Sequence, residues 1–420
     1  MYSAIINTCD WGSTGKIAKG LQEYLIARGD KVLFCYGRGE KRDDEERYRF
    51  CSKLEVDIHY ADTRLTGRLN GASKAATRRL IARLRRAAVK EIYIINLHGY
   101  ILNEKLFLEY LVSDDIHVVY IMADESAFLG NCTYRLECEE YRQGCVDCRD
   151  IKGLAKLICP NASKNAFATK KDAYSKIKYI SFVAPGFVIE SAKTSPLMQG
   201  KRMEIVDEAI DVRVNTPKDT TALRMDLGIK DEQIVIVCVA PFSYPRKGVK
   251  YFVEAAKRLE GDERFVFVQV GYDAKDKSGL PKNYIPIGYV NGQEVLTQYY
   301  SLADLFVFPS IQDTMPNACL EALACGSPLL CFNTSGMPYI ADETVMTLVE
   351  ARNVEQMVEV VKTTKKKTQA TIDTCRNYAL ERYDNQKYFE RLKSIMDKMK
   401  EDYMIPFNKP YCSGRELKYI

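Results

Sequence analysis

Short apolar runs and longer amphipathic segments alternate along most of this chain. Runs such as YSAIINT and QIVIVCVA are rich in Val and Ile, which is typical of strands buried in a parallel sheet. The segments between them repeat apolar side chains at helical spacing, so the alternation predicts an α/β fold. The predicted strands are 2–8, 31–36, 91–96, 117–122, 179–185, 233–240, 265–270, 305–308 and 328–332, and the predicted helices are 16–28, 78–89, 104–112, 250–259, 294–302, 318–324, 370–383 and 386–402.

The predicted elements fall into two blocks of similar size. A chain of 420 residues is longer than one ordinary domain, and the pattern loosens after residue 150 before a second block begins at 233. We therefore predict an N-terminal domain at 1–205, a second domain at 206–385 that begins with a linker through residue 230, and a C-terminal helix and tail at 386–420. Two doubly wound, Rossmann-like sheets hold their ligands at the carboxyl ends of the strands, here in the cleft between the domains.

Composition narrows the class of protein. An apolar share of 46% and a charged share of 28% describe a soluble globular protein, and no run of about 18 uncharged apolar residues is available to span a membrane. The first residues, MYSAIINTCDWG, lack the features of an export signal. Fourteen cysteines without export favour reduced thiols, so we expect a cytoplasmic protein.

Positive charge is concentrated in one segment. Residues 64–90 contain nine Lys and Arg and no acidic residue, and Leu80, Ile81 and Leu84 lie on one face of the predicted helix. One interpretation is a core-facing helix with a solvated basic back. The other is peripheral docking on anionic lipid headgroups, at the inner face of the membrane, or on a phosphorylated lipid-linked acceptor. No aromatic-interleaved basic groove supports a nucleic-acid partner.

The turn after the first strand, DWGSTGKIAKG, resembles a phosphate-binding loop but fits neither common motif. A P-loop would need glycine in place of Asp10 and a hydroxyl residue in place of Ile17, and the glycines do not fit the dinucleotide fingerprint. Gly12 and Gly15 permit a tight turn with exposed N–H groups, so a plain turn and an anion or sugar contact both remain open. Lys16 is interpreted as a helix-start residue only.

The most informative segment is VFPSIQDTMPNACLEALACGSPLLCF, residues 307–332. Asp313 in the loop after a strand and Glu321 on the following helix are eight positions apart, so both carboxylates can face the cleft and accept hydrogen bonds from sugar hydroxyls. The alternative is a surface Asp and a helix-capping Glu. Arg246 and Lys247 lie in another strand-to-helix turn, where a basic pair would meet a diphosphate.

Together these segments resemble the donor-binding domain of the family-4 retaining glycosyltransferases of the GT-B fold. The matching residues are RKG at 246–248, IGYV at 287–290, the run YYSLADLFVFPS and the motif that ends in LEALACGSPLL. Asp313 occupies the place where that family commonly has the first Glu of its motif. The resemblance implies that Arg246 and Lys247 hold the diphosphate and that Glu321 binds the ribose. It also implies that Asp313, Met315, Pro316 and Asn317 face the transferred sugar and that the backbone of Tyr289 and Val290 lies near the base.

The N-terminal half is similar to the branch of that family that makes bacterial capsule, exopolysaccharide and colanic-acid-type glycans. The matching stretches are GSTGKIA, YGRG and NLHGYILN. The resemblance implies transfer of a hexosyl group from a UDP- or GDP-sugar to a glycan or lipid-linked acceptor, with no cofactor required for catalysis. It further implies that Gly12, Ser13, Thr14 and Gly15 approach the donor diphosphate or the acceptor, and that the C-terminal helices return to the N-terminal domain.

The chain departs from the branch at several positions. A His-Asp pair usually ends the strand before the cysteine segment, but here the pair reads Ala123-Asp124, and Glu208-Ala209 replaces Asn-Gly in the linker. With that histidine absent, His98 and Asp124 are the acceptor-side candidates, and a capping or packing role for His98 is the alternative. Two other functions stay open: a donor-binding partner subunit that has lost activity, and a nucleotide-sugar epimerase.

Four cysteines are clustered between the predicted strands 117–122 and 179–185. Cys132, Cys138, Cys145 and Cys148 have the spacing C-x5-C-x6-C-x2-C, and the closing pair is a common half of a tetrahedral zinc site. The spacing predicts a structural zinc in an insertion at 130–150. Unligated reduced thiols are the alternative.

Overall fold

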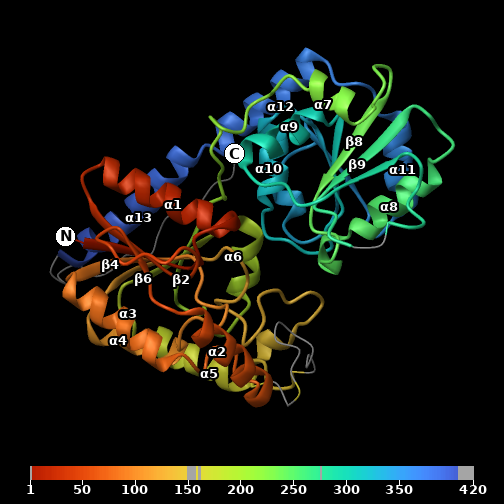
Figure 1. The fold of residues 1–420 in the computed structure, drawn as a ribbon. Coiled ribbons are helices and arrows are strands. Elements are labelled where there is room, and N and C mark those ends of the chain that lie inside the picture. The colour runs from red at the N-terminus through yellow and green to blue at the C-terminus, as the bar shows by residue number, and fades with distance from the viewer. Residues whose placement is uncertain (1, 149–157, 159–161, 275–276, 405–420) are drawn as a thin grey trace, which may run out of the picture.

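The computed structural model describes residues 2–148, 158, 162–274 and 277–404. These residues form two parallel sheets, each enclosed by helices, that belong to two separate domains (Figure 1). The predicted fold class, two Rossmann-like domains, is confirmed.

The N-terminal sheet has seven strands in the order β3-β2-β1-β4-β5-β6-β7. All its pairs are parallel; Ala4, for example, lies opposite Leu33 on one side and Ile92 on the other. The strand order reverses between β1 and β4, which is the switch point where such sheets bind ligands. The strands are β1 (Tyr2–Cys9), β2 (Lys31–Arg38), β3 (Arg47–Arg49), β4 (Val89–Ile94), β5 (His117–Ile121), β6 (Ile180–Ala184) and β7 (Arg202–Ile205).

Helices cover both faces of this sheet. The helix α2 begins at a capping box in which Ser52 and Glu55 exchange hydrogen bonds, and Asn103 caps α4 through its side chain. The helices are α1 (Gly12–Ala27), α2 (Lys53–Thr66), α3 (Lys74–Arg86), α4 (Glu104–Ser113), α5 (Ser163–Lys176) and α6 (Gly186–Lys193), with a 3-10 turn at Glu140–Gln143.

The second sheet has six parallel strands in the order β10-β9-β8-β11-β12-β13. Its central strands β8 and β11 are pure apolar runs, and their side chains form the main core of this domain. The strands are β8 (Ile234–Val239), β9 (Phe265–Val270), β10 (Tyr284–Ile287), β11 (Leu305–Phe308), β12 (Leu329–Phe332) and β13 (Met346–Val349). The helices are α7 (Thr221–Asp226), α8 (Val249–Arg258), α9 (Gln293–Leu302), α10 (Asn317–Ala324), α11 (Val354–Thr363) and α12 (Gln369–Arg382), with 3-10 turns at Pro245–Lys247 and Met337–Tyr339.

The last helix, α13 (Asn385–Met404), crosses back to the N-terminal domain and packs against α1 and β5. Figure 1 shows it in blue behind the red α1. Phe389 and Leu392 join Ile17 and Leu21 in one buried cluster. A Cβ at Gly20 would lie 2.7 Å from the ring of Phe389, so the small residue allows this close approach.

Several boundaries differ from the prediction. α1 begins at Gly12, one turn before the predicted start, and α3 begins at Lys74 and ends at Arg86. Ala88 adopts a left-handed backbone with φ of 50°, which ends the helix early and lets β4 begin at Val89. α2 was not predicted because apolar residues lie on both of its faces, which hides the helical period. No helix in the described residues is long and apolar enough to cross a membrane.

Candidate active site

Arg246, Lys247 and Asp313 form one charged cluster in the C-terminal domain. Lys247 donates a hydrogen bond of 2.6 Å to Oδ2 of Asp313, and Nη1 of Arg246 lies 3.1 Å from the same oxygen. Asp313 is buried, and both cations are about one-fifth exposed. Burial raises the pKa of Asp313, but the charges of Lys247 and Arg246 outweigh it and hold the pKa below its usual value. The two cations therefore keep Asp313 ionised.

The backbone that presents this cluster is constrained by glycine. Arg246 and Lys247 lie in the 3-10 turn between β8 and α8, and Gly248 ends that turn with φ of 66°. A Cβ at Gly248 would lie 1.8 Å from the carbonyl oxygen of Pro309. Only glycine allows the basic turn to approach the loop after β11 so closely.

Glu321 lies on α10, on the C-terminal side of the cleft. Its partner, Lys16, lies on α1 on the opposite side. Nζ of Lys16, on α1, donates to Oε1 of Glu321 at 3.1 Å and also to Oε1 of Gln293. Glu321 is buried, whereas the side chain of Lys16 is half exposed. Lys16 was predicted to be a helix-start residue only. That interpretation is wrong because the residue pairs with a carboxylate of the other domain.

His98 and Asp124 meet at the carboxyl ends of β4 and β5. Nε2 of His98 lies 2.7 Å from Oδ2 of Asp124 and 2.8 Å from the side-chain nitrogen of Asn96. The other oxygen of Asp124 accepts a hydrogen bond from the backbone N–H of Ser126. Burial raises the pKa of Asp124, and the His98 imidazole together with Ser126 lowers it to a net value below the usual range. The structure thus brings together two residues that are 26 positions apart in the sequence.

The turn Gly12–Gly15 forms the first turn of α1. Its N-cap residue, Trp11, makes no capping hydrogen bond through its side chain. Gly12 and Ser13 are exposed, Gly15 is buried, and Thr14 accepts a hydrogen bond from Asn7. An uncapped helix start with exposed residues suits an anion or sugar oxygen. Contact of this turn with donor or acceptor stays a prediction.

The other residues predicted to contact the donor differ in how deeply they are buried. Met315 is buried in the hydrophobic core of the C-terminal domain, and its contact with the transferred sugar stays a prediction. Pro316 caps α10, and Asn317 lines a cavity of about 690 Å³ together with Lys16, Gln293 and Glu321. Tyr289, in the loop before α9, is 83% exposed and Val290 is half-buried. The cavity runs between α1, the linker, α9, α10 and the start of α13.

A buried polar network connects the two domains beside the Asp313 loop. Gln312 donates 2.8 Å to Oε2 of Glu125 and accepts from the backbone N–H of Leu136 at 2.6 Å. Thr314 donates to the carbonyl oxygen of Ala123. The Asp313 loop of the C-terminal domain therefore contacts the backbone of Ala123, next to Asp124, at the end of β5.

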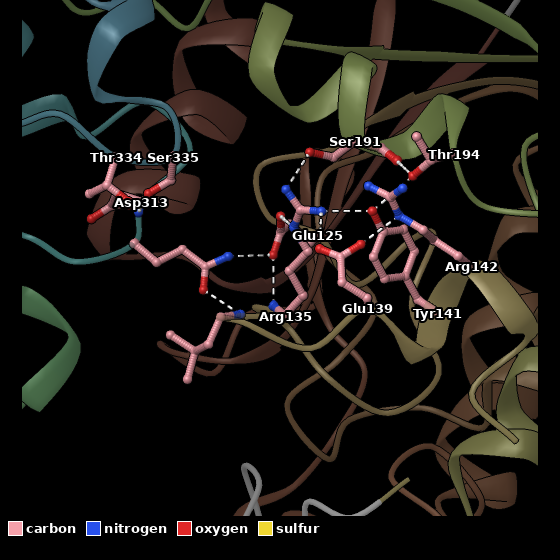
Figure 2. A network of polar contacts seen from close by, with 12 residues as sticks. Glu125, Arg135, Glu139, Tyr141, Arg142, Ser191, Thr194, Asp313, Thr334 and Ser335 are labelled. Carbon is pink, nitrogen blue, oxygen red and sulfur yellow. Dashed lines mark hydrogen bonds and ion pairs between the residues drawn. The ribbon is translucent and has the colours of Figure 1, made fainter. Parts of the chain in front are cut away.

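Glu125 is the centre of this network and is fully buried. It accepts hydrogen bonds from Gln312 and from the backbone N–H of Arg135, whose guanidinium lies 3.3 Å from its other oxygen. Burial raises the pKa of Glu125 to about 7, although Arg135 opposes the rise. Figure 2 shows Arg135 between Glu125 and Ser191, with Tyr141 beside it and hydrogen-bonded to Thr194. Sequence analysis missed Glu125 because a lone Glu after a strand carries no motif.

The four cysteines of the insertion do not support the zinc prediction. Cys145 is buried and Cys138 is exposed. Burial raises the pKa of Cys145 to about 11, with smaller contributions from Cys148 and Cys138 in the same direction. Among the described residues, no three His, Cys, Asp or Glu side chains are grouped so that they could hold a metal ion. A structural zinc needs its thiolates within bonding distance of one point, so the prediction lacks its geometric basis.

The basic segment 64–90 is partly used inside the fold. Arg79 forms an ion pair of 2.7 Å with Glu55 of α2, and Arg85 pairs with Asp114 through two hydrogen bonds. Arg83 donates to the carbonyl oxygen of Asp44. The buried face of α3 carries Leu80, Ile81 and Leu84, as predicted from their spacing. Membrane contact through this segment stays a prediction.

The chain is similar to known proteins in both sequence and structure. Residues 233–365 match the family of glycosyl transferases group 1. Over 95% of this chain and all of the compared chain, the structure superposes on Anabaena HepE in complex with UDP-glucose with a TM-score of 0.63 at 14% identity. It also superposes on WaaG, a glycosyltransferase involved in lipopolysaccharide biosynthesis, over 94% and 99% of the two chains with a TM-score of 0.64 at 18% identity.

The chain has the GT-B fold.

The relatives found by sequence similarity match a smaller part of this chain than the solved structures do. A D-inositol 3-phosphate glycosyltransferase of Mycobacteroides abscessus is 28% identical over 171 residues, 38% of each chain. A UDP-Gal:alpha-D-GlcNAc-diphosphoundecaprenol alpha-1,3-galactosyltransferase of Escherichia coli is 27% identical over 184 residues, 40% of this chain and 46% of the relative. The chain therefore spans less than half the length of these two relatives.

Proposed function

We propose that this GT-B protein is a glycosyltransferase that moves a sugar from a nucleoside-diphosphate donor to a glycan or lipid-linked acceptor. The observation that carries the proposal is the cluster of Arg246, Lys247 and Asp313, which lies beside the strand end that holds Asp124. Two cations and a sugar-binding carboxylate on one domain, facing an imidazole–carboxylate pair on the other, form a site with separate donor and acceptor sides. The match of residues 233–365 to group 1 glycosyl transferases supports the donor assignment.

The chemistry requires stabilisation of a leaving diphosphate. Arg246 and Lys247 hold the two phosphates. They offset the negative charge that grows on the diphosphate as its bond to the anomeric carbon of the sugar breaks. Because side-chain cations supply this charge, the reaction we propose needs no metal ion. Asp313 holds both cations in place through Oδ2 before the donor arrives, and we assign its Oδ1 to accept a hydrogen bond from a sugar hydroxyl.

The remaining residues fix the nucleoside and the acceptor. Glu321 accepts hydrogen bonds from the ribose hydroxyls, and His98 with Asp124 contacts the acceptor hydroxyl at the other side of the cleft. We assign retention of configuration, with the leaving phosphate itself taking the acceptor proton. Two relatives support an acceptor in bacterial surface polysaccharide synthesis. One is the Escherichia coli galactosyltransferase, whose name includes a diphosphoundecaprenol substrate, and the other is a putative teichuronic acid biosynthesis glycosyltransferase of Bacillus subtilis, 28% identical over 207 residues.

A second function, a donor-binding subunit without transfer activity, is favoured by Ala123 at the position of the family histidine. One experiment separates the two. Wild-type protein is screened by calorimetry against UDP-, GDP- and ADP-sugars, and the sugar that binds is then supplied with lipid-linked acceptors. Transfer that Glu321→Ala abolishes, with an unchanged circular dichroism spectrum, supports the enzyme. Donor binding with neither transfer nor donor hydrolysis would identify the subunit, and full activity of Glu321→Ala would refute the site.

A further inference from the structure

The ring of Tyr134, in the N-terminal domain, lies against the guanidinium of Arg246, in the C-terminal domain. Cζ of Arg246 is 3.9 Å from the centroid of the Tyr134 ring, whereas the other cation–ring contacts in the described part of the chain are 4.7 Å or longer. A separation this short requires the cation to lie over the face of the ring, where the negative π-surface attracts it. An aromatic side chain of one domain therefore covers one face of a cation that we assign to the donor diphosphate.

Hydrogen bonds on both sides of Tyr134 fix the backbone that carries this ring. The carbonyl oxygen of Thr133 accepts from the backbone N–H of Glu125 at 3.0 Å, and the N–H of Arg135 donates to the Glu125 carboxylate at 2.7 Å. The Arg135 guanidinium is held in turn by Glu125 and Ser191 (Figure 2). The N-terminal domain thus presents Tyr134 from a segment that its own contacts hold in place.

The residue after Arg135 bonds to the other domain. The backbone N–H of Leu136 donates to Oε1 of Gln312 at 2.6 Å, and the carbonyl oxygen of Gln312 accepts from Nη1 of Arg246. Residues 134–136 therefore meet the C-terminal domain at two adjacent points, the Arg246 guanidinium and the Gln312 side chain. Both domains together determine where the Arg246 guanidinium lies.

The contacts of Arg246 leave one edge of its guanidinium free. Nη1 donates to Gln312 and lies 3.1 Å from Oδ2 of Asp313, whereas Nε and Nη2 form no hydrogen bond within the described part of the chain. The side chain is about one-fifth exposed. Since a guanidinium binds a phosphate through N–H groups in its own plane, a ring over its face leaves that mode of binding open and restricts rotation out of the plane.

We propose that Tyr134 is a positioning residue of the donor site, whose ring orients Arg246 so that Nε and Nη2 meet the second phosphate of a nucleoside diphosphate. This role rests on the proposed function, which assigns Arg246 to that diphosphate. Because Tyr134 belongs to the N-terminal domain, the diphosphate site is complete only when the two domains are arranged as in this structure. A residue of the acceptor domain then contributes to donor affinity without touching the donor.

Tyr134 acts through its ring rather than through a charge. Burial raises the pKa of its hydroxyl, and Asp313 and Asp124 add to the rise, while Arg246 opposes it. The side chain is therefore a neutral phenol near neutral pH. A phenolate would pair with Arg246 and compete with the phosphate, whereas a neutral ring restrains the guanidinium and leaves its charge for the donor. Phenylalanine should accordingly replace Tyr134, and leucine should not.

The test compares affinities for UDP and UMP, with GDP and GMP in parallel, by titration calorimetry on the full-length protein. For the base that binds more tightly, the ratio of diphosphate to monophosphate affinity isolates the contribution of the second phosphate. Tyr134→Leu should lower this ratio by about 5-fold to 30-fold, the range of a partly desolvated cation–ring contact, and leave the monophosphate affinity within about twofold. Tyr134→Phe should keep the ratio within about twofold of wild type.

Further variants show whether the effect passes through Arg246. The control Tyr378→Leu removes a ring that lies 4.7 Å from Cζ of Arg382, on α12, and should leave the ratio unchanged. Arg246→Gln should lower the ratio at least as much as Tyr134→Leu does. The double variant Tyr134→Leu/Arg246→Gln should then be no lower than Arg246→Gln alone, since Tyr134 acts only through the guanidinium.

Several results would overturn the role of Tyr134. These are an equal loss of the ratio in Tyr134→Phe, multiplied losses in the double variant, or an equal loss of both affinities in Tyr134→Leu, which would indicate a general loss of structure. A wild-type preference for the diphosphate that Tyr134→Leu retains would overturn this role and leave the proposed function intact. Absence of nucleotide binding by wild type, or equal affinities for diphosphate and monophosphate, would overturn the proposed diphosphate site and the role of Tyr134 with it.

Discussion

Lys16 and Glu321 form an ion pair of 3.1 Å between the two domains, although 305 residues separate them in the sequence. Glu321 is the carboxylate that we assign to the ribose of the donor. The ammonium group of Lys16 therefore competes with the ribose hydroxyls for Oε1 of Glu321. Gln293 accepts from the same ammonium group and fixes it there.

Lys16→Met should raise the affinity for a nucleoside diphosphate. The donor then no longer competes with an ion pair, and a half-exposed pair of this kind contributes up to about 1 kcal/mol, which corresponds to a twofold to fivefold gain. Titration calorimetry measures the change, and Lys19→Met, which changes another lysine at the same cavity, is the control. A loss of affinity in Lys16→Met would mean that Lys16 binds the nucleotide itself.

Asp313→Asn should destabilise the protein. The substitution leaves Arg246 and Lys247 without their anion in a mostly buried position, which costs roughly 2–4 kcal/mol. The pKa of Asp313 is depressed in the fold, so its contribution is present above the unfolded value of 3.8 and is lost as pH falls through the lower folded value. Chemical denaturation at pH 7 and at pH 3 should show a smaller difference between wild type and variant at the lower pH.

The control for this change is Asp262→Asn. Asp262 also pairs with an arginine, Arg264, but that guanidinium is 60% exposed, so we expect a loss below about 1 kcal/mol. Equal losses of stability for the two variants would show that burial of the cluster around Asp313 does not increase the contribution of its ion pairs.

Glu208→Gln should make stability less dependent on pH. Burial, reinforced by the charges of Asp313 and Asp124, raises the pKa of Glu208 to about 8. A raised carboxyl pKa means that the folded state binds the extra proton, so wild-type stability falls as pH rises from the unfolded value of 4.5 to about 8. Above pH 8 the variant should be more stable than wild type by at least about 1 kcal/mol. Thermal unfolding from pH 5 to pH 9 tests this, with the exposed Glu390→Gln as control; parallel curves for wild type and Glu208→Gln would contradict it.

The sequence predicts local features of this molecule well and contacts between the domains poorly. Arg246, Lys247 and Asp313 could be placed together because parallel strands bring their carboxyl ends to one edge of a sheet. Lys16 and Glu125 could not, because their partners lie in the other domain and the pairing depends on how the two domains meet.

Two features of the N-terminal half could not be predicted for reasons that are local to that domain. Apolar residues on both faces of α2 conceal its helical period, so the helix emerges only from the structure. Cysteine spacing indicates that four thiols can approach one another but does not fix their distances, and among the described residues no three metal-ligating side chains are grouped.

His98→Gln and Asp124→Asn should each slow transfer by about 100-fold while leaving donor affinity unchanged, because these residues lie on the acceptor side of the cleft. Nε2 of His98 and Oδ2 of Asp124 are 2.7 Å apart, so the two side chains act as one unit and the double variant should be little slower than either single variant. Steady-state rates with saturating donor measure the rate of transfer, and calorimetry measures the donor affinity. His117→Gln, which alters a histidine stacked on Tyr179 at the opposite end of β5, should retain full activity. Multiplicative losses in the double variant would show that His98 and Asp124 act separately, and a matching loss of donor affinity would move the pair to the donor side.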